Sequence, residues 1–332
     1  MKNSKISRRS FTQGIAGAAL IGAATGFPGI SYGAKKLKYG TAAPPSSISA
    51  RAAEDLWRVV RERTSGEIDF EVFAKSLGLG EKDLLEGAAL GTVDAAGTAY
   101  SGTREFDLFY SPYFFRDAAH SLRVANGPLY EPTRKALAEK YSCHFLGVGR
   151  AGPWNLFLRE DLKSFDGLKG RKIRAAQIEG QLKGLKHLGA EPVPIAFNEL
   201  YGALKSGIVD GCGTLASLAI PMKFYEVCKY IARNDFGMGL DKFWISSRVW
   251  NSWSKRNQQI VQESFLALEP IVYAKRVQDE MEPQYKRWEE INGAGTVLSL
   301  DASDAQRKMA PVNKALADEV FGSGTWDKIQ KA

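Results

Sequence analysis

The sequence predicts an α/β protein with two lobes, a cleft between them and one long helix that crosses both lobes. Strand-like and helix-like segments alternate over the first 160 residues, and the alternation repeats from residue 167 onward. The chain has 332 residues, of which 44% are apolar and 25% charged, as in globular proteins large enough for two domains. A helical pattern persists from 252 to 292, interrupted by Pro270. Such a helix would be about 60 Å long, which exceeds the diameter of one domain.

The N-terminal residues 1–34 have the pattern of a cleavable export signal. A twin-arginine motif, "SRRSFT", precedes a weakly apolar run from Gly14 to Phe27, and small residues follow in "SYGA". The apolar run is shorter than the about 20 residues that a permanent membrane helix needs. We expect cleavage near Gly33 or Ala34 and a soluble mature protein outside the cytoplasm. The alternative is a frayed N-terminus of a cytosolic protein.

The first half of the mature chain contains the elements of one α/β lobe. Apolar alternation or β-rich composition predicts strands at 37–40, 67–74, 94–100 and, as strand–turn–strand, 143–160. Helical spacing predicts helices at 47–66, 79–93 and 117–140, and Gly66 and Gly91 are suitable stop residues. Strands that alternate with helices in this way favour a mostly parallel sheet.

The second half repeats the pattern. Strands are expected at 171–176, 191–195, 209–214 and 241–250, and helices at 181–188, 198–207 and 216–229 before the long helix. In open α/β sheets a ligand lies beyond the carboxyl ends of the strands. The ends of "RKIRAA", "EPVPIAF" and "VDGCGT" should therefore face one site.

Charge and composition argue against nucleic acid as a partner. The formal net charge is +8 at pH 7, and loss of the four basic residues of the signal leaves 8 − 4 = +4. These charges form no basic cluster of the kind that nucleic-acid-binding proteins have.

The motifs of metal sites, nucleotide sites and nucleophilic catalysis are missing from the sequence. The three histidines, His120, His144 and His187, are far apart, and there is no HExxH, CxxC, GxSxG or GxGxxG after a strand. The cysteines are expected to be small buried apolar residues, with at most one disulfide among them. They are Cys143, Cys212 and Cys228.

Arg174 is the residue whose position points most directly to a site. It ends the strand-like run "RKIRA" just before a helix, so its guanidinium could face the cleft. The rigid fork of a guanidinium pairs bidentately with a carboxylate. Spacing alone leaves the alternatives open: a surface arginine, or a structural ion pair with Glu179 or Glu199.

The run from Gly167 to Tyr230, "GLKGRKIRAAQIEGQLKGLKHLGAEPVPIAFNELYGALKSGIVDG" through "KFYEVCKY", resembles the solute-binding proteins of tripartite ATP-independent periplasmic (TRAP) transporters. Upstream, "LGLGEKDLLEGAALGTVDA" and "SPYFFRDAAHSLRVANGPL" are also similar to this family. The resemblance implies a two-lobed periplasmic binding protein-like fold that closes on its ligand and delivers it to a membrane permease. We expect lobe I at 35–151 plus 240–279 and lobe II at 152–239 plus 280–332.

The resemblance also implies roles for single residues. The family's arginine at the position of Arg174 binds the ligand carboxylate. Thr214 stands where many members have an asparagine, so it offers one hydroxyl, and Gly213 replaces a glutamate, which makes a metal-bridged ligand unexpected. Trp154 occupies the position of a second arginine in sialic-acid receptors. We therefore expect a monocarboxylate with an apolar or aromatic body.

The complete expected ligand site spans both lobes. Its residues are Arg174, Thr214, Trp154, Phe197, Tyr100 and Thr41. Thr41 and Tyr100 are the contacts from the first lobe, and Phe197 and Trp154 would pack against the ligand body. No catalysis, cofactor or metal is expected, and the protein should be a monomer whose partners are an organic acid and TRAP permease subunits. Two alternatives are an exported enzyme of the oxidoreductase type and a receptor that presents its ligand to a sensor.

Overall fold

The computed structural model describes residues 36–75 and 77–332, so the expected export signal lies outside the described residues. Its strands form a mixed sheet in the order β2-β1-β3-β9-β4-β7-β5-β6, with β8 and β10 attached beside β4. The strands are β1 Leu37–Thr41, β2 Phe70–Ala74, β3 Ala95–Thr98, β4 Cys143–Leu158, β5 Lys172–Ala175, β6 Glu191–Pro194, β7 Gly211–Leu215, β8 Tyr230–Arg233, β9 Met238–Ser246 and β10 Val297–Ser299. The alternation of strands and helices thus yields the α/β architecture that the sequence predicts.

The helices connect and cover these strands. They are α2 Ile48–Arg63, α3 Glu81–Leu90, α4 Arg104–Asp107, α5 Ala118–Asn126, α6 Glu131–Lys140, α7 Glu179–His187, α8 Leu200–Ser206, α9 Ser247–Ser252, α10 Lys255–Leu268, α11 Ala274–Asn292, α12 Ser303–Phe321 and α13 Thr325–Lys331. Helices α3 and α8 end as expected, at Gly91 and Gly207, which take left-handed conformations that only glycine adopts without strain.

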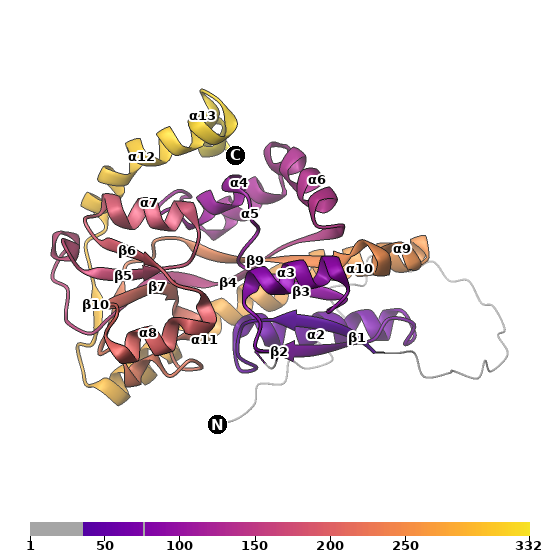
Figure 1. The fold of residues 1–332 in the computed structure, drawn as a ribbon, viewed down its shortest axis with the longest axis horizontal. Helices are drawn as coiled ribbons and strands as arrows, with labels where there is room; N and C mark the ends of the chain where they lie inside the picture. The colour runs from indigo at the N-terminus through magenta and orange to yellow at the C-terminus, as the bar shows by residue number, and fades with distance from the viewer. Residues whose placement is uncertain (1–35, 76) are drawn as a thin grey trace. The chain divides into compact units, whose positions relative to one another are not determined.

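Strands β4 and β9 join two groups of parallel strands (Figure 1). In the first group β1 pairs with β2 and β3, and in the second β5 pairs with β6 and β7. The first part of β4, up to Pro153, pairs antiparallel with β9, and its last part, from Trp154 on, pairs antiparallel with β7. One strand therefore belongs to both halves of the fold.

The expected turn within 143–160 is wrong, because β4 is one strand of 16 residues. The glycines of "GVGRAG" produce two register shifts, between Phe145 and Gly147 and between Arg150 and Gly152, instead of a reversal. Glycine inside a strand marks a β-bulge as readily as a turn, since both need backbone angles that other residues avoid. Sequence spacing does not distinguish the two.

Two expected helices also differ from the structure. The helix at 117–140 is divided into α5 and α6, because Gly127 is extended ahead of Pro128 and a residue before proline avoids the helical region. The helix at 216–229 is wrong: that segment contains only the short 3₁₀ turns Ala216–Leu218 and Phe224–Glu226. Pro221 lies between them, and Lys223 has a left-handed φ of 55°.

The long helix is present, and Pro270 changes its winding. Helix α10 continues into a π-helical segment, Glu269–Tyr273, and then into α11, so that Lys255 to Asn292 is one helical run. A π-turn accommodates the missing N–H of proline without ending the helix. Helix α10 packs against α2 and β4, whereas α11 packs against β4, β10 and the 3₁₀ turns that follow β7. The run thus contacts both halves of the fold, as expected for a helix that crosses two lobes.

Candidate ligand-binding site

Arg174 is buried at the carboxyl end of β5, with 3% of its surface exposed. Its Nε donates a hydrogen bond to the carbonyl oxygen of Ile195, at 2.9 Å. Within residues 36–75 and 77–332 its terminal nitrogens make no hydrogen bond, and no carboxylate pairs with it. Glu179, one of its expected partners, pairs with Arg104 and Lys183 instead. Arg174 is therefore not a surface arginine, and it is not paired with a carboxylate of the described chain.

Burial lowers the pKa of Arg174 to about 10, while the nearby Cys212 and Glu81 act to raise it. The guanidinium remains protonated at neutral pH, so the cavity wall carries a positive charge. A buried cation that lacks an acidic partner is costly unless another group pairs with it. An anionic ligand would supply that group.

A cavity opens at this end of the sheet, and Arg174 forms part of its wall. Four other predicted site residues line the same cavity, namely Thr41, Trp154, Phe197 and Thr214. Tyr100 does not; it lines an adjacent hollow that shares Arg174 and Phe197 with the cavity. The structure thus brings five of the six expected residues together, from β1, β4, β5, β7 and the turn before α8.

The cavity is small and mostly apolar. It encloses about 60 Å³ that the centre of a water molecule can reach. Apolar walls with a few convergent polar groups are typical of small-molecule sites. The space suits a small organic ligand.

Trp154 and Gly213 form a matched pair across β4 and β7. A Cβ atom at position 213 would lie 2.6 Å from Cζ2 and 3.1 Å from Nε1 of the indole. Behind the indole packs Phe236, with ring centroids 4.6 Å apart. The absence of a side chain at Gly213 thus creates the space that Trp154 occupies. The two departures from the family pattern are therefore in contact with each other.

The indole N–H of Trp154 is an unused donor. Nε1 is buried and has no hydrogen-bond partner among the described residues, although the ring borders the cavity. A buried donor without an acceptor costs about 1–3 kcal/mol. The N–H is enclosed by protein, so Trp154 contributes to the cavity the flat apolar surface that the sequence suggested.

Sequence reasoning missed two acidic residues of the cavity, Glu81 and Asp241. Glu81 begins α3, and its two carboxylate oxygens accept hydrogen bonds from the backbone N–H groups of Ala99 and Tyr100, each at 3.1 Å. Burial raises the pKa of Glu81, although these two hydrogen bonds act to lower it. Burial also raises the pKa of Asp241, to about 6. Asp241 and Lys242 are adjacent charged residues in the otherwise apolar strand "GLDKFWIS", and this pair is the one feature of the sequence that could have indicated Asp241 as a site residue.

Lys242, next to Asp241 on β9, does not line the cavity. It is fully buried, its ammonium group lies over the rings of Phe106 and Tyr110, and it donates to the carbonyl oxygen of Ala99. Burial lowers the pKa of Lys242 to about 8, partly offset by the neighbouring carboxylates, Glu81 first among them. Successive residues of a strand face opposite sides, which explains why only Asp241 reaches the cavity.

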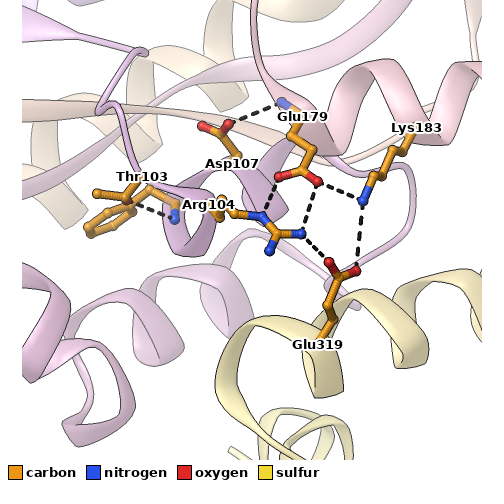
Figure 2. Close-up of polar contacts among 7 residues, drawn as sticks. Thr103, Arg104, Asp107, Glu179, Lys183 and Glu319 are labelled. Carbon is orange, nitrogen blue, oxygen red and sulfur yellow. Dashed lines mark hydrogen bonds and ion pairs between the residues drawn. The ribbon is translucent and has the colours of Figure 1, made fainter.

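An ion-pair cluster holds the N-terminus of α7 beside the cavity (Figure 2). Arg104 of α4 donates two hydrogen bonds to Glu179, at 2.6 and 3.0 Å, and a third to Glu319 of α12 at 2.6 Å. Lys183 lies 2.6 Å from Glu179, and these cations lower the pKa of Glu179 to about 2. Asp107 accepts the backbone N–H of Glu179 at 3.0 Å. The cluster connects three helices that are far apart in the sequence.

The position of α7 matters for the site because Gln181 lines the cavity. The Gln181 amide donates to the carbonyl oxygen of Gly213 at 3.2 Å and accepts the backbone N–H of Ala176. Gly180 allows the close packing, since a Cβ there would lie 2.3 Å from the carbonyl oxygen of Asp107. The cluster and this glycine together hold β5, β7 and α7 in register around Arg174.

The remaining candidates have structural roles. Cys143, Cys212 and Cys228 are unpaired and buried, as the sequence indicated. Of the histidines, His120 is buried against the carbonyl oxygen of Ile329, and His144 stacks on Trp250. Over the part of the chain that the structure describes, no group of His, Cys, Asp or Glu side chains is arranged to hold a metal ion. None of the helices in that part is both long and apolar enough to span a membrane.

Comparison with known proteins identifies the family and agrees with the fold. Residues 39–321 match the family of bacterial extracellular solute-binding proteins, family 7 (DctP). A solute-binding protein of Roseobacter denitrificans is 29% identical over 69% of this chain and 71% of its own length. A TRAP solute-binding protein of Polaromonas bound to D-erythronate is 24% identical, with a TM-score of 0.81 over 89% of this chain and 97% of that one. One of Desulfovibrio salexigens with bound orotic acid is 22% identical, with a TM-score of 0.79 over 89% and 96%.

Proposed function

Because the chain belongs to family 7 of the bacterial extracellular solute-binding proteins, we propose that it is the receptor of a TRAP transporter, capturing an organic acid through Arg174 and passing it to the membrane permease. Members of this family are substrate-binding receptors of transporters, and the protein is a receptor rather than an enzyme. The observation that carries the proposed role of Arg174 is its buried guanidinium, which borders the cavity and has no carboxylate partner among the described residues.

The favoured ligand is a monocarboxylate with an apolar or aromatic body. Arg174 is the only cationic residue that lines the cavity within the described chain, so one carboxylate is matched there. Trp154 and Phe197 supply apolar walls for the body, and Thr214 and Thr41 supply hydroxyls. Tyr100, in the adjacent hollow, would contact a ligand that extends past Arg174. The structurally similar Desulfovibrio protein was solved with bound orotic acid, which is a flat acid.

Ligand capture would involve closure of the two lobes. Arg174 lies on β5 in the second group of strands and Thr41 on β1 in the first, so one ligand can contact both groups. A ligand that contacts both lobes stabilises the closed conformation by population shift. The sequence led us to propose lobes at 35–151 plus 240–279 and at 152–239 plus 280–332. The chain would pass from the first lobe to the second near Gly152 of β4, where a bulge interrupts the pairing with β9.

Export completes the proposed role. The twin-arginine motif would direct the chain to the periplasm, with cleavage near residues 33–34. Changing Arg8 and Arg9 to Lys should leave the precursor in the cytoplasm, and N-terminal sequencing of the periplasmic protein should start near residue 34. A receptor that presents the acid to a sensor would use the same site. Loss of uptake on deletion of the permease subunits would favour transport.

The central experiment compares Arg174→Ala with Arg171→Ala. Arg171 belongs to the same segment, but its guanidinium donates to the carbonyl oxygens of Glu160 and Asp161 outside the cavity. A thermal-shift screen would first rank aromatic and aliphatic monocarboxylates, dicarboxylates and sialic acid. Calorimetry with the best acid should then show a loss of about 3 kcal/mol or more, over about 100-fold, for Arg174→Ala alone.

Arg174→Lys separates charge from geometry. Lysine keeps a positive charge but loses the planar fork, so we expect an affinity between those of the native protein and Arg174→Ala. Near-native affinity of Arg174→Ala would refute the role of this residue. Stabilisation by dicarboxylates or sialic acid alone would refute the favoured ligand class and leave the receptor assignment intact.

A further inference from the structure

The cavity presents a carboxylate as well as a guanidinium. Asp241, the fourth residue of β9, is only 8% exposed and lines the same cavity as Arg174. Within the described chain neither residue forms an ion pair with the other or with any third residue. A ligand that met both would need a negatively charged end and, separately, a group that donates a hydrogen bond.

The carboxylate of Asp241 is poorly supplied with donors. An ionised carboxylate has about four acceptor sites. The hydroxyl of Ser49, which also lines the cavity, forms a hydrogen bond with Asp241. Two neighbouring donors are used elsewhere, because Lys242 donates to Ala99 and the hydroxyl of Tyr110 donates to the carbonyl oxygen of Leu240. Buried polar groups rarely remain so incompletely paired, and those that do need an explanation.

Glu81 provides the contrast inside the same cavity. Both of its oxygens already accept backbone N–H groups, which stabilise the ionised form without a ligand. Of the two acids, Asp241 thus has the greater unused acceptor capacity. Its position therefore bears on which ligands the cavity accepts.

The balance of charge points the same way. Arg174, Glu81 and Asp241 line the cavity, and the buried ammonium of Lys242, outside the lining, acts to lower the pKa of both acids. A carboxylate bound by Arg174 would neutralise that cation and add a negative charge to a buried space that holds two acids, which is unfavourable in a low dielectric. A ligand that also brings a hydroxyl or ammonium donor offsets the charge of Asp241, and an ammonium offsets it most.

We propose that Asp241 is a specificity-determining residue that accepts a hydrogen bond from a hydroxyl or ammonium group of the ligand, so that the preferred acid carries such a donor in addition to its carboxylate. The inference rests on the proposed function for the carboxylate end, which Arg174 binds. It is compatible with an apolar or aromatic body, because Trp154 and Phe197 line other parts of the wall. It adds a polar requirement that the sequence did not reveal.

The test uses acids that differ only in the donor. The aromatic series is phenylacetate, mandelate, phenylglycine and 4-hydroxyphenylacetate, and the aliphatic series is butyrate, 2-hydroxybutyrate and 2-aminobutyrate. Dissociation constants are measured by calorimetry on the full mature protein. We expect at least one donor-bearing acid to bind tenfold or more tightly than the parent of its series.

Two variants and a control assign the preference to Asp241. Asp241→Asn keeps an acceptor oxygen but loses the charge, so an ammonium preference should fall to under threefold while a hydroxyl preference is retained. Asp241→Leu removes the acceptor and should abolish both. Asp235→Asn is the control, an exposed aspartate that lines a separate hollow and not the cavity of Arg174, and it should behave like the native protein.

The outcomes distinguish this inference from the proposed function. Equal binding of parent and donor-bearing acids, or a preference that survives Asp241→Leu, overturns the role of Asp241 while the receptor function stands. Absence of binding by every acid, in a protein that melts cooperatively, contradicts both. A hydroxyl preference that exceeds the ammonium preference identifies a hydroxy acid, and the reverse identifies an amino acid.

Discussion

Replacing Gly213 by alanine tests the pairing of this glycine with Trp154. The added Cβ would lie 2.6 Å from Cζ2, 3.0 Å from Cε2 and 3.1 Å from Nε1 of the indole. Carbon atoms in contact prefer separations of about 3.5–4.0 Å, so the ring or the strand must move by about 1 Å. Phe236, 1% exposed, packs against the indole and restricts its movement. The ring also borders the cavity, and we expect it to move into that open space.

The magnitude follows from overpacking. Insertion of a methyl group into a well-packed interior costs about 1–3 kcal/mol. Because the indole borders the cavity, a displaced ring would also reduce the space for a ligand. We expect Gly213→Ala to lower the free energy of unfolding by about 1–3 kcal/mol and the affinity for the best acid by about tenfold or more.

Urea denaturation and calorimetry would measure the two effects. Gly202→Ala is the matched control, because no atom lies within 4 Å of a Cβ there and alanine favours the helix α8 in which it lies. The double variant Trp154→Phe/Gly213→Ala removes the distal atoms of the indole and should be less destabilised than the sum of its single changes. The reasoning fails if Gly213→Ala behaves like Gly202→Ala, or if the double variant shows no coupling.

Three further predictions concern single groups. Trp154→Phe keeps an aromatic wall but removes part of its apolar surface, so calorimetry should show about three- to tenfold weaker acid binding; unchanged affinity means that the ligand body does not pack on the indole. Burial raises the folded-state pKa of Asp241 to about 6, above the ordinary value of 3.8, so its stabilising contribution is present below pH 4 and lost as pH rises through 6. Asp241→Asn should therefore raise the melting temperature at pH 8 and give no gain at pH 4, with about 3 kcal/mol as an upper bound at pH 8; equal shifts at both pH values would contradict this. Arg104 and Lys183 lower the pKa of Glu179 to about 2, so Glu179→Gln should cost about 1 kcal/mol above pH 5 in urea denaturation, a difference that vanishes as pH falls toward 2; a cost that persists at pH 2 would show that the ion pairs are not its cause.

Much of the architecture could be predicted because it is encoded by local patterns. Period-2 and period-3.6 runs located β1, β5, β7 and the helices α2, α3, α7 and α8 to within a few residues, and Gly91 and Gly207 marked helix ends. The failures share one cause: the same residue types serve different backbone geometries. The glycines of "GVGRAG" form bulges in β4 rather than a turn, and Pro270 sits in a π-turn that continues the helix.

The site was predicted in part for a similar reason. Arg174 could be located because the carboxyl end of a strand and its guanidinium are both visible in the sequence, and the family resemblance indicated its role. Glu81 and Asp241 carried no comparable signal, since each is one of many acids in a chain with 37. Their presence in one cavity depends on how α3 and β9 pack.

By itself, the sequence determined the α/β class, the long helix, the family resemblance and an arginine at a strand end, because each depends on neighbours within a few residues or on a motif read in order. Tertiary structure alone decided that β4 runs unbroken through both halves, that Trp154 fills the space left by Gly213, and that Asp241 faces the cavity of Arg174. These residues are separated by 59 or more positions along the chain, and packing and burial, which no local pattern records, bring them together.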